Sequence, residues 1–216
     1  MALIAVSCFD QATSRACAEV LDALAVQYRF LPDPSNSEPP SGGIMEGIGA
    51  LLVGGAGDLP QQSHDQPGAS QTYALEQALA RNIPILAIGA GMQLLNLAFG
   101  GGLLDELPGH MPEKGESGAG NHQIYVSPGS KLSAILGPGG FFRVSSLHHR
   151  GLRDPQRSPR LLTSAYSLED GVVEGLESPA HDWVIGVQFQ PERSGEVPRS
   201  FRHLFEAFVE RADRGR

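Results

Sequence analysis

The chain has 216 residues, with 24 acidic and 16 basic side chains and a net charge of −8. This balance argues against a nucleic-acid surface, because a phosphate backbone is bound by clustered lysine and arginine. The length fits a single domain over residues 1–216, with no linker or repeat that would divide it. The two cysteines, Cys8 and Cys17, imply no disulfide framework, and no apolar run is long enough to span a membrane. We therefore expect a soluble, cytoplasmic protein.

The first half of the chain alternates strands and helices. We expect strands over residues 4–8 and 48–53 and another that opens at Pro84, with helices over 13–27, 71–81 and 91–99. Residues 32–43 contain four prolines and are expected to form a loop. The entirely apolar strand 48–53 is typical of a sheet covered by helices on both faces. The alternation predicts an α/β fold with a doubly wound, mostly parallel sheet.

The second half is expected to add shorter, more antiparallel strands. These cover residues 123–126, 141–144, 160–166, 172–176 and 184–189, and a closing helix covers 198–211. That helix carries apolar residues at spacings that suit burial against the sheet. Residues 109–120 are rich in glycine, glutamate and proline, and we expect a mobile flap there.

Two segments have the pattern of a catalytic elbow and its partner. Residues 83–95, IPILAIGAGMQLL, are typical of a buried strand, a tight turn of small residues and a helix, and a nucleophile would sit in that turn. Residues 183–192, WVIGVQFQPE, form a second strand that ends in a polar residue, a proline and a carboxylate.

Both segments resemble the class I glutamine amidotransferase family, most closely its branch of γ-glutamyl hydrolases. In that family the motifs G-I-C-R-G-M-Q and G-V-Q-F-H-P-E supply a cysteine nucleophile, a histidine base and a glutamate that orients the histidine. The resemblance puts Gly89 at the cysteine position, Gln190 at the histidine position and Glu192 at the glutamate position. It extends to residues 53–58 (the oxyanion loop), 96–101, 144–149 and 170–174, and so covers nearly the whole chain.

The two replacements remove the chemistry that the resemblance implies. Glycine has no side chain to attack an amide, and glutamine cannot shuttle a proton as histidine does. We therefore predict that cysteine-dependent glutaminase or γ-glutamyl hydrolase activity is absent. Gly89 also suits the positive φ that a strand-turn-helix elbow demands, so it can stabilise the fold while removing the nucleophile.

A binding pocket without catalysis is compatible with the remaining residues. The amides of Gly55 or Ala56 and of Ala90 are expected to offer donors to a carboxylate or carbonyl. The resemblance makes a further set ligand-facing: Gln93, Ser146, His148, His149 and Arg150. Because Ala90, Ser145 and Arg150 depart from the family pattern, we hypothesise a changed small-molecule ligand of γ-glutamyl or amino acid type, with an extra anionic group that meets Arg150.

Other catalytic groups remain as alternatives. Cys8 ends the first strand, and His148 or His149 is a candidate base. Zinc could be held among His110, Glu113, Glu116 and His122, but their spacing matches no known site, so we expect no metal and no cofactor. For Glu192 the sequence leaves open a hydrogen bond to Gln190 or a structural role.

Three interpretations of function follow. The first is a pseudoenzyme that binds a small amino acid compound or a partner. The second is an active hydrolase that uses a different catalytic group. The third is an interaction subunit that docks on a partner enzyme. The resemblance also implies a homodimer.

Overall fold

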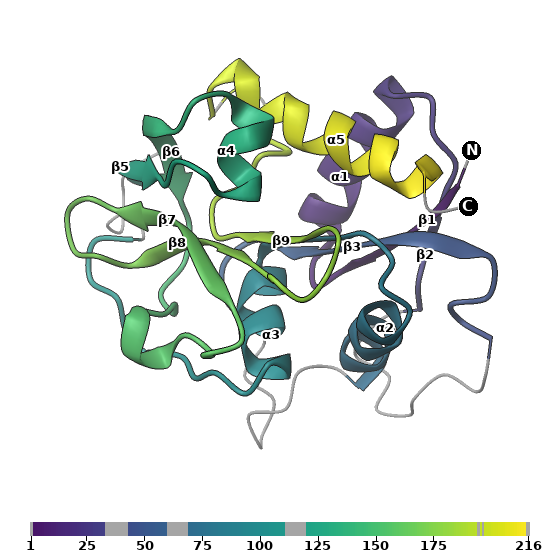
Figure 1. The fold of residues 1–216 in the computed structure, drawn as a ribbon, viewed down its shortest axis with the longest axis horizontal. Coiled ribbons are helices and arrows are strands. Elements are labelled where there is room, and N and C mark those ends of the chain that lie inside the picture. The colour runs from purple at the N-terminus through teal and green to yellow at the C-terminus, as the bar shows by residue number, and fades with distance from the viewer. Residues whose placement is uncertain are drawn as a thin grey trace.

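The computed structural model describes residues 2–32, 43–59, 69–110, 120–193, 195 and 197–214. Within these residues one nine-stranded sheet has the order β2-β1-β3-β4-β9-β8-β7-β5-β6 (Figure 1). The strands are β1 (Leu3–Cys8), β2 (Tyr28–Phe30), β3 (Ile48–Gly55), β4 (Ile85–Gly89), β5 (Gly120–Val126), β6 (Gly140–Ser146), β7 (Leu162–Ser167), β8 (Val173–Glu177) and β9 (Val184–Val187). The α-helices are α1 (Gln11–Ala23), α2 (Ala69–Ala80), α3 (Ala90–Ala98), α4 (Lys131–Leu136) and α5 (Arg202–Arg214), with 3-10 turns at Asp154–Gln156 and Arg199–Phe201.

The sheet changes direction at β9. Strands β2, β1, β3, β4 and β9 pair in parallel, whereas β8, β7, β5 and β6 continue from β9 in antiparallel pairs. This mixed sheet confirms the predicted α/β fold with antiparallel strands added in the second half. The carboxyl ends of β1, β3, β4 and β9 therefore meet along one edge, which is where sites form in such sheets.

Helices cover both faces of the parallel half. Apolar side chains from α1 and α5 pack on one face, and side chains from α2 and α3 pack on the other, while α4 lies on the α5 side over the antiparallel strands β7 and β8. Alternate residues of one strand enter opposite cores, as Leu52 and Val53 of β3 do. This two-sided burial explains why β3 is apolar along its whole length, as predicted.

Some predicted boundaries differ from the observed ones. Helix α1 ends at Ala23 rather than at residue 27, because Ala25 takes a φ of 54° and the chain turns into the short strand β2. Helix α4 was not predicted; Ser130 caps it by accepting a hydrogen bond from the amide of Ser133 at 3.0 Å. The predicted loop at 32–43 and flap at 109–120 lie almost wholly outside the described residues.

Candidate functional site

Gly89 forms the turn between β4 and α3. Its φ of 55° and ψ of −116° confirm the predicted positive-φ elbow. A Cβ built on Gly89 would lie 2.2 Å from the carbonyl oxygen of Gly55, far inside the shortest contacts that real Cβ atoms make. The position where a nucleophilic side chain would begin is thus taken up by backbone of the neighbouring strand β3.

The loop after β3 is held by a carboxylate. The amide of Ala56 donates to Oδ2 of Asp10 at 2.8 Å, and the same side chain caps α1 by accepting from the amide and hydroxyl of Thr13, each at 2.8 Å. The Ala56 amide, one of the expected oxyanion donors, is therefore engaged within the fold. Gly55 pairs with Gly89 in the β3–β4 register, and Ala90 is buried at the start of α3.

Residues 188–192 leave the sheet beside this elbow, because β9 pairs in parallel with β4. The carbonyl oxygen of Gln188 lies 3.7 Å from the Cβ position of Gly89. Gln190 and Glu192 are both buried, with 3% and 5% of their surface exposed. Glu192 also lines a cavity of about 570 Å³ between α1 and the start of α5. The structure thus brings the Gly89 turn and the Gln190 segment to one edge, as the resemblance requires.

A second network joins the loop after β3 to residues 148–151. The Asp58 carboxylate accepts hydrogen bonds from the amides of His149 and Arg150, at 3.0 and 2.7 Å, and from Nε2 of Gln93 at 3.3 Å. Gln93 in turn accepts from the amide of Leu59 and donates to the carbonyl of Arg150, both at 3.1 Å. Three residues expected to face a ligand, Gln93, His149 and Arg150, therefore hold two loops together.

The Arg150 guanidinium has an acidic partner on the protein. Its Nη2 lies 2.9 Å from Oδ1 of Asp105, whose side chain is 85% exposed. An anionic ligand at Arg150 would compete with this exposed pair, which is worth little on its own. A ligand contact at Arg150 stays a prediction.

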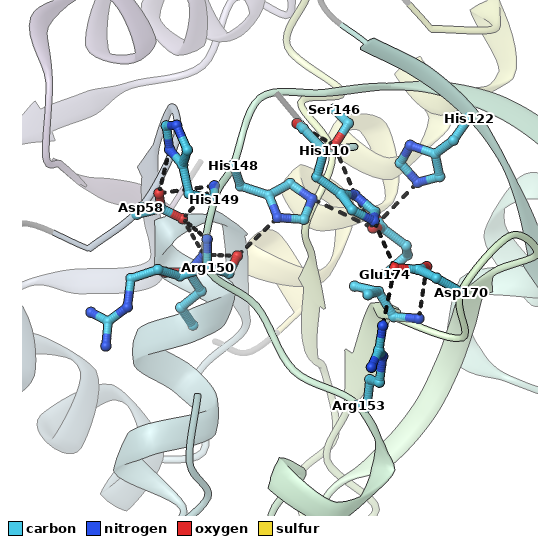
Figure 2. Close-up of polar contacts among 12 residues, drawn as sticks. Asp58, His110, His122, Ser146, His148, His149, Arg150, Arg153, Asp170 and Glu174 are labelled. Atoms are coloured by element: carbon cyan, nitrogen blue, oxygen red, sulfur yellow. Dashed lines mark hydrogen bonds and ion pairs between the residues drawn. The ribbon is translucent and has the colours of Figure 1, made fainter. Parts of the chain in front are cut away.

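The two other residues expected to face a ligand, Ser146 and His148, lie in a buried polar cluster (Figure 2). The centre of the cluster is Glu174 of β8, which is fully buried. Its Oε1 lies 3.3 Å from Nε2 of His122, 3.6 Å from Nε2 of His148 and 4.0 Å from Nδ1 of His110. His110 also contacts Oγ of Ser146 at 3.0 Å.

Sequence reasoning singled out His110 and His122 together but missed Glu174 as their partner. Glu113 and Glu116, the other zinc candidates, lie outside the described residues. The cluster draws on residues 110, 122, 148 and 174, which come from four separate segments, so their spacing carries no local signal. The one indication was that 144–149 and 170–174 both belonged to motifs of the resembled family.

Burial and charge act against each other in this cluster. Burial opposes ionisation of Glu174, but the adjacent His122 and His148 rings outweigh it and lower the pKa of Glu174 to about 2. Burial alone would lower the pKa of His122, yet Glu174 raises it. For His110, burial and the neighbouring His148 ring lower the pKa. The cluster thus favours an ionised carboxylate that needs a positive charge nearby.

Ser146, His110 and Asp170 make a hydroxyl-imidazole-carboxylate chain, since Nε2 of His110 lies 3.1 Å from Oδ2 of Asp170. This chain does not have the properties of a nucleophilic triad. The Ser146 hydroxyl donates to the carbonyl of His110 at 2.8 Å and Ser146 is 1% exposed, whereas the serine of a triad donates to its histidine and faces the substrate. The chain instead fixes the orientation of the His110 ring.

Cys8, the alternative nucleophile, ends β1 opposite Gly54 and is half-buried. It lies beside Cys17, and a hydrogen bond between the two thiols, together with burial, raises the pKa of Cys17. Besides Cys8, the charged groups that act on Cys17 among the described residues are the carboxylates Glu192 and Asp10, whereas a nucleophilic cysteine is activated by a basic neighbour. In the part of the chain that the structure describes, no helix is both long and apolar enough to cross a membrane.

Comparisons with known proteins agree with this architecture. The model of the Peptidase C26 family matches residues 61–192. The chain is 34% identical over 191 residues to γ-glutamyl-γ-aminobutyrate hydrolase PuuD of Escherichia coli K12, covering 83% of this chain and 69% of that protein. A protein of Mycobacterium tuberculosis that carries the name of a glutamine amidotransferase, Rv2859c, is 32% identical, and the match covers 81% of this chain but only 60% of the relative. The crystal structure of a glutamine amidotransferase from Thermotoga maritima superposes with a TM-score of 0.67 at 15% identity, covering 99% and 85% of the two chains.

Proposed function

This chain belongs to the Peptidase C26 family, and we propose that it is a member without cysteine-dependent hydrolysis, whose role is to bind a small γ-glutamyl or related amino acid compound or a partner enzyme. The observation that carries the proposal is the elbow at Gly89. No nucleophilic side chain is present there, and the carbonyl of Gly55 stands 2.2 Å from where one would begin.

Two further observations support the loss of hydrolysis. Thiol-dependent cleavage needs a nucleophile, a base and donors for the oxyanion. Gln190 stands where the resemblance expects the base, and the Ala56 amide is held by Asp10. Removing a triad nucleophile or base lowers kcat by about 10⁶-fold, and further losses add little. The expected rate of the natural protein is therefore at most about 10³- to 10⁴-fold above the very slow uncatalysed reaction, which is too little for product to be detected in an ordinary assay.

The binding role rests on the family and on the retained architecture of the sheet edge. The relative from Escherichia coli is named for hydrolysis of a γ-glutamyl amide, which makes compounds of that class the first ligands to test. Dimer formation, which the resemblance implies, belongs to the same proposal.

The test is an assay of hydrolysis beside an assay of binding. Purified full-length protein is incubated with γ-glutamyl-p-nitroanilide and γ-glutamyl-γ-aminobutyrate, with the Escherichia coli relative as the positive control. We expect no release of product above background, and measurable turnover by the natural protein would refute the pseudoenzyme. In parallel, glutamate, γ-glutamyl-γ-aminobutyrate and dicarboxylates are screened by thermal shift.

A genuine ligand at 100 times its Kd stabilises the protein by about 2.7 kcal/mol, which corresponds to a rise in Tm of about 5–10 °C for a chain of this size. If no compound shifts Tm, the small-ligand role fails and affinity purification for a partner enzyme becomes the remaining test. The Gly89→Cys, Gln190→His double variant is compared with a triple variant that adds Asp10→Ser. Serine keeps a cap on α1 and releases the Ala56 amide. We therefore expect higher turnover by the triple variant than by the double variant.

A further inference from the structure

The buried cluster around Glu174 has the composition of a metal site. His110, His122 and Glu174 each offer a ligand atom, and these atoms lie within 4.8 Å of one another. All three residues are more than nine-tenths buried. Buried imidazole and carboxylate groups together are the usual ligands of zinc.

Among the described residues, the Glu174 carboxylate has no ion-pair partner with a permanent positive charge. Among the described residues its oxygens make no hydrogen bond of regular geometry, and its ion pairs and the weaker hydrogen-bond contacts that lower its pKa are to histidine rings alone. A fully buried carboxylate without a hydrogen bond or a fixed positive charge is strongly destabilising. Something positive must therefore compensate it, either protons on the rings or a cation between them.

The ring nitrogens are arranged for a cation. Both side chains are buried, yet the ring nitrogens of His122 and Nε2 of His148 make no hydrogen bond of regular geometry to a described residue, their nearest recorded partner being the Glu174 carboxylate. Nδ1 of His148 lies 2.8 Å from the carbonyl oxygen of Arg150, which can only accept, so Nδ1 carries the hydrogen. In the neutral ring, Nε2 then directs a lone pair at Oε1 of Glu174, 3.6 Å away. Two lone pairs facing each other at that distance need a positive charge between them.

The distances fit zinc. Two ligand atoms at about 2.1 Å from a tetrahedral zinc ion lie about 3.4 Å apart. The separations from Oε1 of Glu174 are 3.3 Å to His122, 3.6 Å to His148 and 4.0 Å to His110. The ligand atoms of His110, His122 and Glu174 all lie within 4.8 Å of one another, so movements of about 1 Å by the side chains would bring them to the separations around one zinc ion (Figure 2).

Outer contacts also match a metal site. Nε2 of His110 lies 3.1 Å from Asp170, so Nδ1 is the atom that would bind the ion, in exchange for its present 3.0 Å contact with Oγ of Ser146. Asp170 is itself 3.5 Å from Arg153. A carboxylate that accepts the second N–H of a ligating histidine fixes the ring and raises its basicity. We propose that His110, His122 and Glu174 bind one zinc ion, with His148 as the nearest fourth ligand, and that the ion ties β5, β8 and residue 110 together. This inference departs from the expectation of no metal and does not depend on whether the chain hydrolyses anything.

The test measures metal directly. Untagged full-length protein, expressed with added zinc and passed through a desalting column, is analysed for metal by mass spectrometry. We expect about one zinc per chain, and His122→Gln and Glu174→Gln variants are expected to lose it. His203→Gln, a change at an exposed histidine of α5, is the matched control and should retain it. Asp170→Asn keeps all the ligands and is expected to weaken zinc binding by about 10- to 100-fold.

A spectroscopic measurement on the natural protein guards against variants that fail to fold. Cobalt(II) is added to the apoprotein in place of zinc, and its visible absorption is recorded. Absorption as intense as that of tetrahedral cobalt(II), which disappears when one equivalent of zinc is added, supports the proposal. Protein that takes up no zinc or cobalt after chelator treatment and reloading would overturn it, and protons on the histidine rings would then be the compensating charge. Retention of zinc by both ligand variants would equally overturn it, because the ion would lie elsewhere.

Discussion

Replacing Gly89 by alanine tests the closed elbow directly. Alanine adds a single methyl group, so the variant probes space and backbone conformation without introducing new chemistry. That methyl would meet the carbonyl oxygen of Gly55 at 2.2 Å, and Gly89 sits at a φ of 55° with a ψ of −116°. Both features predict a loss of stability.

The two contributions can be estimated separately. A residue other than glycine in such a sparsely populated backbone region costs about 1–3 kcal/mol. Forcing the β3 backbone away from the methyl is an overpacking change that costs about another 1–3 kcal/mol. Together they lower the free energy of unfolding by about 2–6 kcal/mol, which for this chain length corresponds to a fall in Tm of about 4–24 °C.

Gly47→Ala is the matched control. Gly47 has a φ of 72°, but nothing lies within 4 Å of its Cβ position, so that variant carries the backbone cost alone. Urea unfolding and calorimetry of both variants give the cost at Gly89 beyond that of a positive φ, which includes the Gly55 contact and the unusual ψ of −116°. If Gly89→Ala costs no more than Gly47→Ala, the elbow has room for a side chain, and the structural argument against a nucleophile there fails.

Three further perturbations have defined outcomes. Asp10→Ala removes the α1 cap and the partner of the Ala56 amide, and should lower the free energy of unfolding by about 1–3 kcal/mol in urea titrations, with Asp10→Asn losing less; equal stability of Asp10→Ala and the natural protein would contradict this. Asp58→Ala should speed proteolytic cleavage between residues 147 and 151, because the carboxylate holds the amides of that segment, and an unchanged cleavage rate would show that other contacts hold it. Burial and Lys131 lower the pKa of His181 in the folded protein below 6.5, its usual value in the unfolded chain. The contribution of the neutral ring to stability is therefore present above pH 6.5 and is lost as the pH falls from 6.5 through the folded-state pKa. The difference in stability between the natural protein and His181→Asn should shrink from pH 7.5 to 5.5, and a constant difference would exclude this titration.

Hydrophobic periodicity predicted most of the fold. The buried strands β1, β3 and β4 are short runs of apolar residues, and their helices have apolar residues at helical spacing. Strand β3 is the clearest case, because it is buried on both faces and is therefore apolar at nearly every position. The missed elements are short. Strand β2 has three residues and α4 has six, which is too few for a period to show.

The site was predictable only where local sequence dictates backbone. Gly89 lies in a strand-turn-helix pattern, so its place at the sheet edge and its positive φ could be expected. The hydrogen bond from Ala56 to Asp10 joins residues 46 positions apart, and no sequence pattern in either segment predicts it. The histidines around Glu174 are likewise brought together by strand pairing across the antiparallel half, which single-sequence patterns do not encode.

The Asp10 carboxylate also bears on how easily hydrolysis could be introduced into a chain that, as proposed, lacks it. It accepts hydrogen bonds from the first turn of α1 and from the Ala56 amide at once, so its loss frees that amide but also removes the cap of α1 unless the replacing residue can cap the helix itself. A lineage that regained only a cysteine at position 89 would bear the strain against Gly55 without gaining a usable oxyanion site. On the proposed function, each of these substitutions alone is therefore expected to cost stability without restoring hydrolysis.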